Sequence, residues 1–209
     1  MSEVAVQASI PRRRPLALRG GILLALGIAI GVAGFFLWKA HARYHLAVVQ
    51  PGVLYRDGLK SSAQFAATLD RAHPKTVVSL IDEKEMSDPG KPQLAAEAEL
   101  CSRRGITLDR IPVTLGGWPN SADVQKFLAI VADKENQPVL VHCAQGVRRT
   151  GMFVAAYQES VLGYDKARAK AAVLSFGHGR NTVEQIDRFI DGYDPKTQTV
   201  PADLGGGSE

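Results

Sequence analysis

Cysteine is scarce in this chain, which has only Cys101 and Cys143 among its 209 residues. Two cysteines cannot build a disulfide-rich scaffold or a zinc site with four cysteine ligands. A disordered chain and a collagen-like fibre are also excluded, because 45% of the residues are hydrophobic, as in an ordinary globular domain. The length predicts a single domain with room for an appendage.

The formal net charge is +4, but most of the chain carries no excess of positive charge. Residues 1–45 carry six lysines and arginines against one acid, whereas residues 46–209 carry nineteen against twenty. Because a basic surface is the usual mark of a polyanion partner, we expect no nucleic acid as partner of the globular part.

Charged residues are missing altogether from Gly20 to Trp38. As a helix, these nineteen residues would span roughly 28 Å, which is close to the thickness of a bilayer's hydrocarbon core. We therefore expect a transmembrane signal anchor at residues 20–38, between a basic N-terminus at 1–19 and a linker at 39–47.

Flanking charge predicts the orientation of this anchor. Four arginines precede the apolar run and only Lys39 and Arg43 closely follow it. The positive-inside rule then places the N-terminus in the cytoplasm and the domain on the periplasmic side of the cell inner membrane. Ala40-His41-Ala42 resembles a cleavage site, so a cleaved signal peptide is the alternative.

Strand-like and helix-like segments alternate over residues 48–194, which we interpret as the domain, with a flexible tail at 195–209. Strands are expected at Val53–Tyr55, Thr76–Ile81, Ile106–Val113 and Val139–His142. Helices are expected at Ser61–His73, Leu94–Arg104, Ser121–Glu135 (with Ser121 as N-cap), Thr150–Leu162, Asp165–Phe176 and Val183–Asp191. The alternation predicts an α/β fold with a central, mostly parallel sheet flanked by helices.

The most informative segment joins the last expected strand to the next helix. Cys143 follows the strand, and Arg149 lies six residues later in the first turn of the helix. Such a loop presents backbone N–H groups and the helix dipole to one point, which favours an anion. Gly146 permits the backbone angles that the loop needs, and Arg149 can donate two hydrogen bonds to phosphate-type oxygens. The same surroundings favour the nucleophilic thiolate of Cys143.

His142-Cys143-x5-Arg149-Thr150 matches the HC-x5-R-[ST] signature of the protein tyrosine phosphatase superfamily. With Pro51-Gly-Val-Leu-Tyr-Arg56 upstream, residues 48–190 resemble bacterial dual-specificity-type phosphatases. The resemblance implies hydrolysis of a phosphorylated protein or a small phosphomonoester through a phosphocysteine, without metal or cofactor. It makes Cys143 the nucleophile, Thr150 a hydrogen-bond donor to the thiolate and His142 a brace of the loop. The phosphate-binding residues that it implies are Ala144, Gln145, Gly146, Val147, Arg148, Arg149 and Thr150.

The general acid of the family is missing from its usual place. The family carries an aspartate in an I-P-V-x-D context, whereas this chain has Ile111-Pro-Val-Thr-Leu115. Asp82, Asp109 and Asp123 are the candidates that remain. Asp123 falls in the first turn of a helix, where a carboxylate also serves as a cap.

Arg148 is a second departure, and it leaves alternatives open. A second arginine next to Arg149 would suit a second anionic group, as in a phosphoinositide or inositol phosphate, or would be a solvated surface charge. Cys143-x-x-Gly146-x-Arg148 also resembles the shorter loop of rhodanese-like sulfurtransferases. An inactive phosphoprotein-binding module is a third reading. Cys101 is interpreted as a small buried residue, with a redox role as its alternative.

Overall fold

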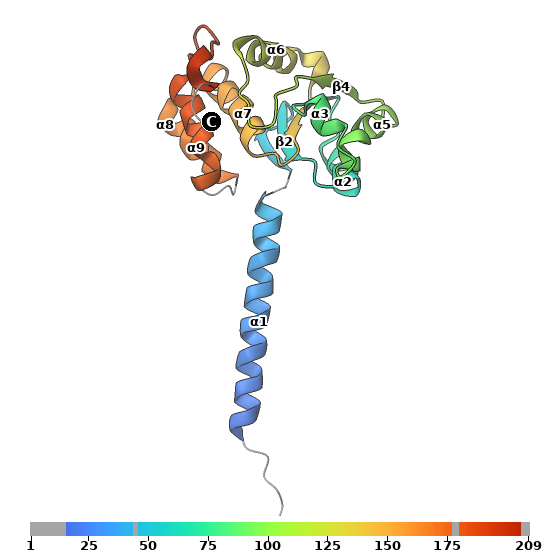
Figure 1. The fold of residues 1–209 in the computed structure, drawn as a ribbon, viewed down its shortest axis with the longest axis vertical. Coiled ribbons are helices and arrows are strands. Elements are labelled where there is room, and N and C mark those ends of the chain that lie inside the picture. The colour runs from blue at the N-terminus through green and yellow to red at the C-terminus, as the bar shows by residue number, and fades with distance from the viewer. Residues whose placement is uncertain (1–15, 44–45, 177–179, 206–209) are drawn as a thin grey trace, which may run out of the picture. The chain divides into compact units, whose positions relative to one another are not determined.

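The computed structural model describes residues 16–43, 46–176 and 180–205. The chain divides into two compact units between Ala40 and His41. Most of the long helix α1 (Leu16–Arg43) belongs to the first unit (Figure 1). Among the described residues, no helix combines the length and the apolar character that crossing a membrane requires. The anchor at residues 20–38 therefore stays a prediction.

The second unit is built on one five-stranded sheet with the order β1-β2-β5-β3-β4. β2, β5, β3 and β4 are mutually parallel, and β1 pairs with β2 in the antiparallel direction. The expected α/β fold with a mostly parallel sheet is thus confirmed. The strand bounds are β1 Ala47–Gln50, β2 Leu54–Gly58, β3 Thr76–Ser79, β4 Thr107–Arg110 and β5 Val139–Cys143.

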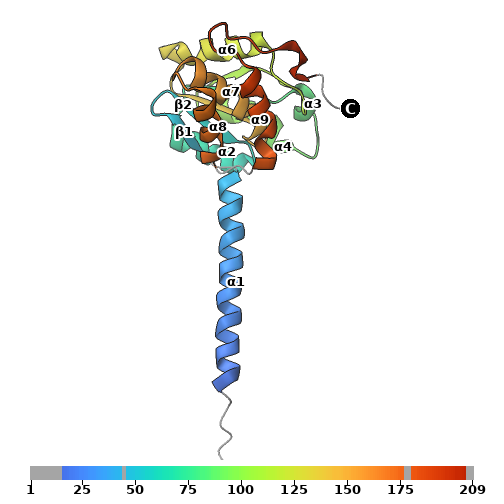
Figure 2. The same cartoon turned by 90° about the vertical axis from the view of Figure 1, so that its left-hand side faces the viewer.

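Helices cover both faces of the sheet, and the alternation of side chains along the strands assigns the faces. Val139 and Val141 of β5 pack in one hydrophobic cluster with α6, α7, α8 and α9. Leu140 points the other way, as successive strand residues do, and packs with α2, α4 and α5. In Figure 1, α7 lies between the sheet and the pair α8–α9, and this pair faces the viewer in Figure 2. The bounds are α2 Ser62–Ala72, α4 Pro92–Ala95, α5 Glu97–Ser102, α6 Ser121–Ala132, α7 Arg148–Ser160, α8 Lys166–Ser175 and α9 Arg180–Gly192.

Several predicted elements differ in extent from the observed ones. The single helix expected at Leu94–Arg104 is two short helices, α4 and α5, which meet at Ala96. Asn120, not Ser121, is the N-cap of α6, because it forms a reciprocal capping box with Asp123. That helix ends at Ala132 and a 3₁₀ turn, Lys134–Asn136, follows it. β1 and the one-turn helix α3 (Glu83–Met86) were not anticipated, because each is only four residues long.

The segment after Asp194, where the sequence predicts a flexible tail, makes contacts with the domain as far as the structure describes it. Asp194 and Thr199 form an isolated antiparallel bridge. The amide of Val200 donates to Ser121 Oγ at 2.9 Å, and a 3₁₀ turn follows at Ala202–Gly205. Residues 206–209 of the predicted tail lie outside the described residues.

Candidate active site

The loop between β5 and α7 brings the predicted site residues together at the carboxyl end of the parallel strands. Binding sites of open α/β sheets are built at this edge. β5 ends at Cys143, which is only 3% exposed, and α7 begins at Arg148. Gly146 has φ +67°, in the left-handed region that favours glycine, and its amide donates to Cys143 Sγ at 3.2 Å. The loop therefore wraps around the sulfur.

The carboxyl end of β2 supports this loop from the neighbouring position in the sheet. Gly58 pairs with Cys143 in the parallel register, and Leu59 N donates to Cys143 O at 3.2 Å. A Cβ atom added to Gly146 would come within 2.4 Å of the carbonyl oxygen of Asp57. The guanidinium of Arg56 donates to the carbonyl oxygen of Gly146. Loop and strand are thus in backbone contact.

Arg149 is fixed by acceptors from two other segments. Nη1 donates to the carbonyl oxygens of Leu80 at 3.1 Å and Val113 at 2.9 Å, and also to a carboxylate oxygen of Glu85. Nη2 donates to the second oxygen of Glu85 at 3.0 Å. A guanidinium has five N–H donors. Both on Nη1 and one on Nη2 are used here, and the side chain also makes a hydrogen bond with Cys143. The donors that remain on Nε and Nη2 therefore face the sulfur, where an anion would bind.

The environment of Cys143 favours its thiolate. Burial disfavours the charged form, but the Arg149 charge and hydrogen bonding from Thr150 and the Gln145 amide outweigh it. The pKa of Cys143 is therefore below its ordinary value. Thr150 is fully buried, as its expected position beside the thiolate requires.

His142 is buried behind the loop, where it makes an ion pair with Glu97. Burial alone would lower the pKa of His142, but the charge of Glu97 and their hydrogen bond raise it above its ordinary value. Arg110 contacts the other oxygen of Glu97 at 3.2 Å, and the His142 ring packs on Phe65 with centroids 4.9 Å apart. This arrangement matches the structural role expected for His142.

Arg148 is bonded to the backbone of a neighbouring loop, and its binding of a second anionic group stays a prediction. Its Nη1 donates to the carbonyl oxygens of Gly116 and Gly117, both at 2.9 Å. The side chain is half-buried, so it is not a solvated surface charge. It ties the start of α7 to the loop that lacks the family's aspartate.

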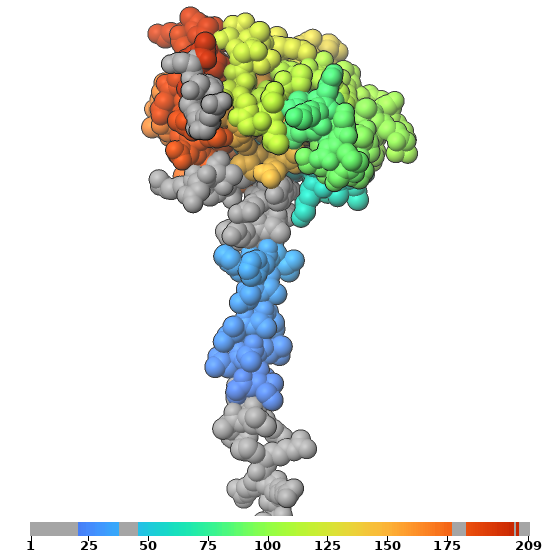
Figure 3. Space-filling model, in the orientation of Figure 1, coloured from blue at the N-terminus to red at the C-terminus, as the bar shows by residue number. Residues whose placement is uncertain are grey.

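A pocket of about 240 Å³ opens above Cys143. It is lined by Glu85, Lys91, Leu115, Cys143, Ala144, Gln145, Arg148 and Arg149. An adjoining pocket of about 390 Å³ shares Glu85, Lys91 and Leu115 and adds Asp82. In Figure 3 the yellow-green segment around residues 110–120 crosses the visible face between the red α9 and the green segment after β3. Leu115 of this segment lines the pocket above Cys143.

The three candidate acids do not line the pocket above Cys143, as far as its described lining shows. Asp123 is taken up by the capping box of α6. Asp109 lies in β4 at the edge of the sheet. Asp82 comes nearest, because one of its oxygens accepts from the Leu115 amide at 3.2 Å while the other caps α3. The sequence search therefore leaves the general acid unassigned.

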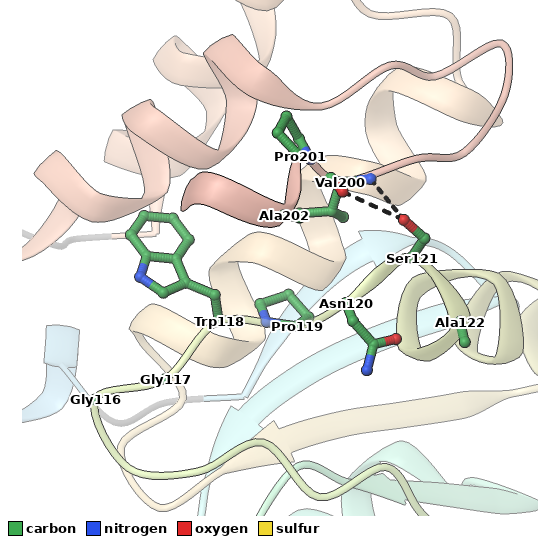
Figure 4. A pocket seen from close by; sticks show the side chains of 10 residues that line it. All are labelled: Gly116, Gly117, Trp118, Pro119, Asn120, Ser121, Ala122, Val200, Pro201 and Ala202. Carbon is green, nitrogen blue, oxygen red and sulfur yellow. Dashed lines mark hydrogen bonds between the residues drawn. The ribbon is translucent and has the colours of Figure 1, made fainter. Parts of the chain in front are cut away.

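A third pocket, of about 570 Å³, lies on the far side of the same loop (Figure 4). Residues 116–122 form one wall and Val200, Pro201 and Ala202 form the other. Figure 4 shows the two hydrogen bonds of Ser121 with Val200 that close one end. The ring of Trp118 lies 5.7 Å from the Arg188 guanidinium of α9. The loop is thus supported on both sides.

Cys101 has no part in this site. It packs with Leu140 in the cluster on the opposite face of the sheet, and both cysteines are free thiols. Burial raises the pKa of Cys101 to about 12, with a further contribution from the charge of Glu97. These surroundings suit a small buried residue, not a redox partner. Within the described ranges, no three His, Cys, Asp or Glu side chains gather closely enough to hold a metal ion.

Sequence reasoning missed three charged residues that the fold places against the loop: Arg56, Glu85 and Glu97. Each is at most 5% exposed, and buried charges are rare unless they are paired. A weak signal was available for Glu85, since it closely follows the carboxyl end of β3, the neighbour of β5. Arg56 belongs to the upstream stretch that resembles the family, but the sequence assigned it no role, and Glu85 and Glu97 lie in no motif.

Comparison with known proteins agrees with this geometry. The family model described as a DSP-PTPase phosphatase fused to NAD⁺ kinase matches residues 53–190. The dual specificity protein phosphatase TpbA of Pseudomonas aeruginosa is 32% identical over 149 residues, which cover 68% of this chain and 59% of TpbA. A probable chloroplastic NAD kinase 2 of Oryza sativa is 29% identical over 107 residues, 51% of this chain and 10% of the kinase. The chain thus spans about three fifths of TpbA and a tenth of the kinase.

Solved structures show the same fold. The crystal structure of P. aeruginosa TpbA superposes with a TM-score of 0.56 and 29% identity, over 73% of this chain and 87% of that one. The core catalytic domain of the PP-IP phosphatase SIW14 from S. cerevisiae, in complex with citrate, superposes with a TM-score of 0.58 and 23% identity. That match covers 71% of this chain and 85% of SIW14. Since the family model covers more than half of the sequence and the signature loop has the expected surroundings, the chain belongs to the DSP-PTPase family of phosphatases.

Proposed function

We propose that this protein is a cysteine-dependent phosphatase of the dual-specificity type that hydrolyses phosphotyrosine and related phosphomonoesters. The observation that carries the proposal is Cys143, a buried thiol whose pKa is lowered by Arg149, the side chain that also makes a hydrogen bond with it. TpbA supports the substrate class, because a crystal structure of its variant in complex with phosphotyrosine superposes with a TM-score of 0.57 and 27% identity.

The first step is the transfer of the phosphoryl group to sulfur. The Cys143 thiolate attacks phosphorus, an S–P bond forms, and the P–O bond to the leaving group breaks with its electron pair on that oxygen. Arg149 and the loop amides bind the other three oxygens, where charge is spread in the transition state. The leaving oxygen takes a proton from an acid or from water.

The second step regenerates the enzyme. A water molecule attacks phosphorus in line with the S–P bond and gives up a proton to solvent. A P–O bond forms as the S–P bond breaks, and inorganic phosphate leaves. The electron pair of the broken bond returns to sulfur, so Cys143 departs as the thiolate. Thr150 and the Gly146 amide stabilise that thiolate, which makes it a better leaving group.

The absence of an assigned acid predicts a preference among substrates. General acid catalysis is worth about 10²–10⁴-fold. Aryl phosphates lose a stable phenolate and need little help, whereas alkyl phosphates lose a strongly basic alkoxide. We therefore propose that phosphotyrosine esters turn over faster than phosphoserine or phosphothreonine esters.

The function is tested with the full chain, kept in solution by a mild detergent, and an aryl phosphate in the presence of EDTA. Wild type and Cys101→Ala should release phosphate. Cys143→Ser should lose turnover and still bind phosphate, because the loop amides and Arg149 remain. Full activity in Cys143→Ser would refute the phosphocysteine mechanism.

Phosphate hydrolysis fits the loop better than sulfur transfer does. The rhodanese-like reading requires Arg148 as the anion-binding residue, but Arg148 is bonded to Gly116 and Gly117. Thiosulfate-to-cyanide transfer that depends on Arg148 and not on Arg149 would favour that alternative. An inactive phosphoprotein-binding module would bind a phosphopeptide without ever releasing phosphate.

We also propose that residues 20–38 anchor the protein in the cell inner membrane, with the N-terminus cytoplasmic and the domain periplasmic. This proposal rests on the sequence, namely nineteen residues without a charge that follow four arginines. The test is protease access to the domain in cells whose outer barrier has been opened. Complete protection would place the domain in the cytoplasm, and a shortened mature chain would indicate a cleaved signal peptide.

A further inference from the structure

We propose that Arg56 is a positioning residue of this active site, which holds the peptide between Gly146 and Val147 so that its N–H faces the bound phosphate. Arg56 lies outside the signature motif, on a different strand. The expected effect of Arg56 on catalysis rests on the proposed phosphatase function, whereas the contacts of Arg56 with the loop do not depend on it.

Strand register brings Arg56 under the loop. β2 and β5 run in parallel with Arg56 opposite Val141 and Gly58 opposite Cys143, so Arg56 lies one strand repeat before the catalytic position. Leu54, two residues earlier, packs in the cluster that α7 and α8 cover, and side chains two apart share a face. Arg56 therefore points to the side on which α7 begins, and it is only 2% exposed.

A hydrogen bond and a ring contact help to hold the guanidinium of Arg56 in this place. Its Nη2 donates to the carbonyl oxygen of Gly146, ninety residues away in sequence. Its carbon Cζ lies 4.2 Å from the ring centroid of Phe176, which covers the planar face. Arginine supplies both a flat face and a fork of donors, and lysine does not.

The hydrogen bond to Gly146 determines the direction of an amide. A peptide unit is planar and trans, so its C=O and N–H point in opposite directions. With the Gly146 carbonyl turned to Arg56, the N–H of Val147 in the same unit points away from β2. The Gly146 N–H, in the preceding unit, is the group that donates to Cys143 Sγ. Without Arg56, the carbonyl could turn into the phosphate site and repel the substrate.

Burying the charged guanidinium of Arg56 costs free energy, because the cation loses its hydration. Burial lowers the pKa of Arg56 to about 10, and the charges of Cys143 and Asp57 work in the opposite direction. Arg56 is thus a cation at neutral pH. A buried ionic group can often be replaced by an apolar one without loss of stability. The retained charge therefore points to a role next to the thiolate and the phosphate.

The test compares Arg56→Met, Arg56→Lys and, as a packing control, Phe176→Leu, in the full chain with detergent. The first measurement is the pH midpoint of Cys143 alkylation by iodoacetamide, followed by peptide mass spectrometry with buried Cys101 as internal reference. The second is kcat/KM for an aryl phosphate, and the third is unfolding by urea.

We expect Arg56→Met to raise the alkylation midpoint and to lower kcat/KM about ten- to hundred-fold, as loss of a hydrogen bond to a charged group does. Arg56→Lys keeps the charge and hence the midpoint, but it cannot both stack on Phe176 and reach Gly146, so kcat/KM falls about ten-fold. Phe176→Leu removes the ring that covers the guanidinium but keeps the charge and the bond to Gly146, so it should lower stability, lower kcat/KM less than Arg56→Met does, and leave the midpoint unchanged.

Wild-type kcat/KM in Arg56→Lys, or a wild-type midpoint in folded Arg56→Met, would overturn the proposal. Alkylation requires no phosphatase activity. If the wild-type protein releases no phosphate, the proposed function is refuted. The pH midpoints of Cys143 alkylation in wild type and Arg56→Met would still show whether Arg56 acts on the loop.

Discussion

Replacement of Gly146 by alanine tests how tightly the loop is packed on β2. Two separate costs arise at this position. An L-residue at φ +67° is strained, at about 1–2 kcal/mol. The added Cβ would also lie 2.4 Å from the Asp57 carbonyl oxygen, and overpacking of this kind costs about 1–3 kcal/mol. Together Gly146→Ala should lower the free energy of unfolding by about 2–5 kcal/mol.

The same substitution should reduce catalysis strongly. The atoms that the added Cβ would meet all belong to the backbone of β2, so the clash can be relieved only by movement of the loop or of β2. A displacement of the loop moves the Gly146 amide away from Cys143 Sγ and loosens the bond to Arg56. Misplacement by about 1 Å can cost about 10²-fold in rate. We expect a fall in kcat/KM of that order.

Two other glycines separate strain from clash. Gly163, between α7 and α8, also has φ +67°, but a Cβ there would meet nothing within 4 Å. Gly163→Ala should therefore show the strain alone, with full activity. A Cβ on Gly58, which does not have a left-handed backbone, would lie 2.6 Å from the carbonyl carbon of Gln145. Gly58→Ala should show the clash, with a loss of activity.

Urea unfolding and kcat/KM on an aryl phosphate measure both effects in the three variants. If Gly146→Ala loses no more stability than Gly163→Ala and keeps its activity, the loop is not held against β2 as described. If Gly58→Ala retains full activity, the close packing of β2 against the loop does not matter for catalysis.

Three further predictions concern charged groups. Burial raises the pKa of Glu159 to about 7 from an ordinary 4.5, so the folded protein binds this proton more tightly than the unfolded chain does. The stability gained from that proton is present at low pH and is lost as the pH rises through 7. The difference amounts to at most about 3 kcal/mol, and Glu159→Gln should make urea unfolding less pH-dependent between pH 5 and 8.5. Arg148→Ala removes two hydrogen bonds to the loop at residues 114–117 and should speed hydrogen exchange of the Gly117 amide by about ten-fold. Neither wild type nor this variant should transfer sulfur from thiosulfate. An unchanged exchange rate would show that Arg148 does not hold this loop. Asp82→Asn should slow alkyl phosphates by at least about 10²-fold more than aryl phosphates if Asp82 is the general acid, and equal slowing would exclude it.

Much of the fold could be read from local pattern. The strands Thr76–Ser79 and Val139–Cys143 coincide with β-branched apolar runs, and the helix Ser62–Ala72 lies within the expected range Ser61–His73. Short elements escaped because four residues carry too little periodicity, as in β1 and α3. The break between α4 and α5 also left no signal, since neither glycine nor proline lies at Ala96.

The sequence by itself determined the loop around Cys143, because a strand, a turn of four residues and a helix N-terminus are contiguous in the chain. Cys143, Gly146 and Arg149 owe their mutual placement to that local geometry. Only the tertiary structure decided what holds them. The partners Glu85 and Arg56 lie 64 and 90 residues from the loop residues that they bind. Buried ion pairs and close backbone contacts of this kind arise when parallel strands end at the same edge of a sheet, and they leave no periodic trace in a single sequence.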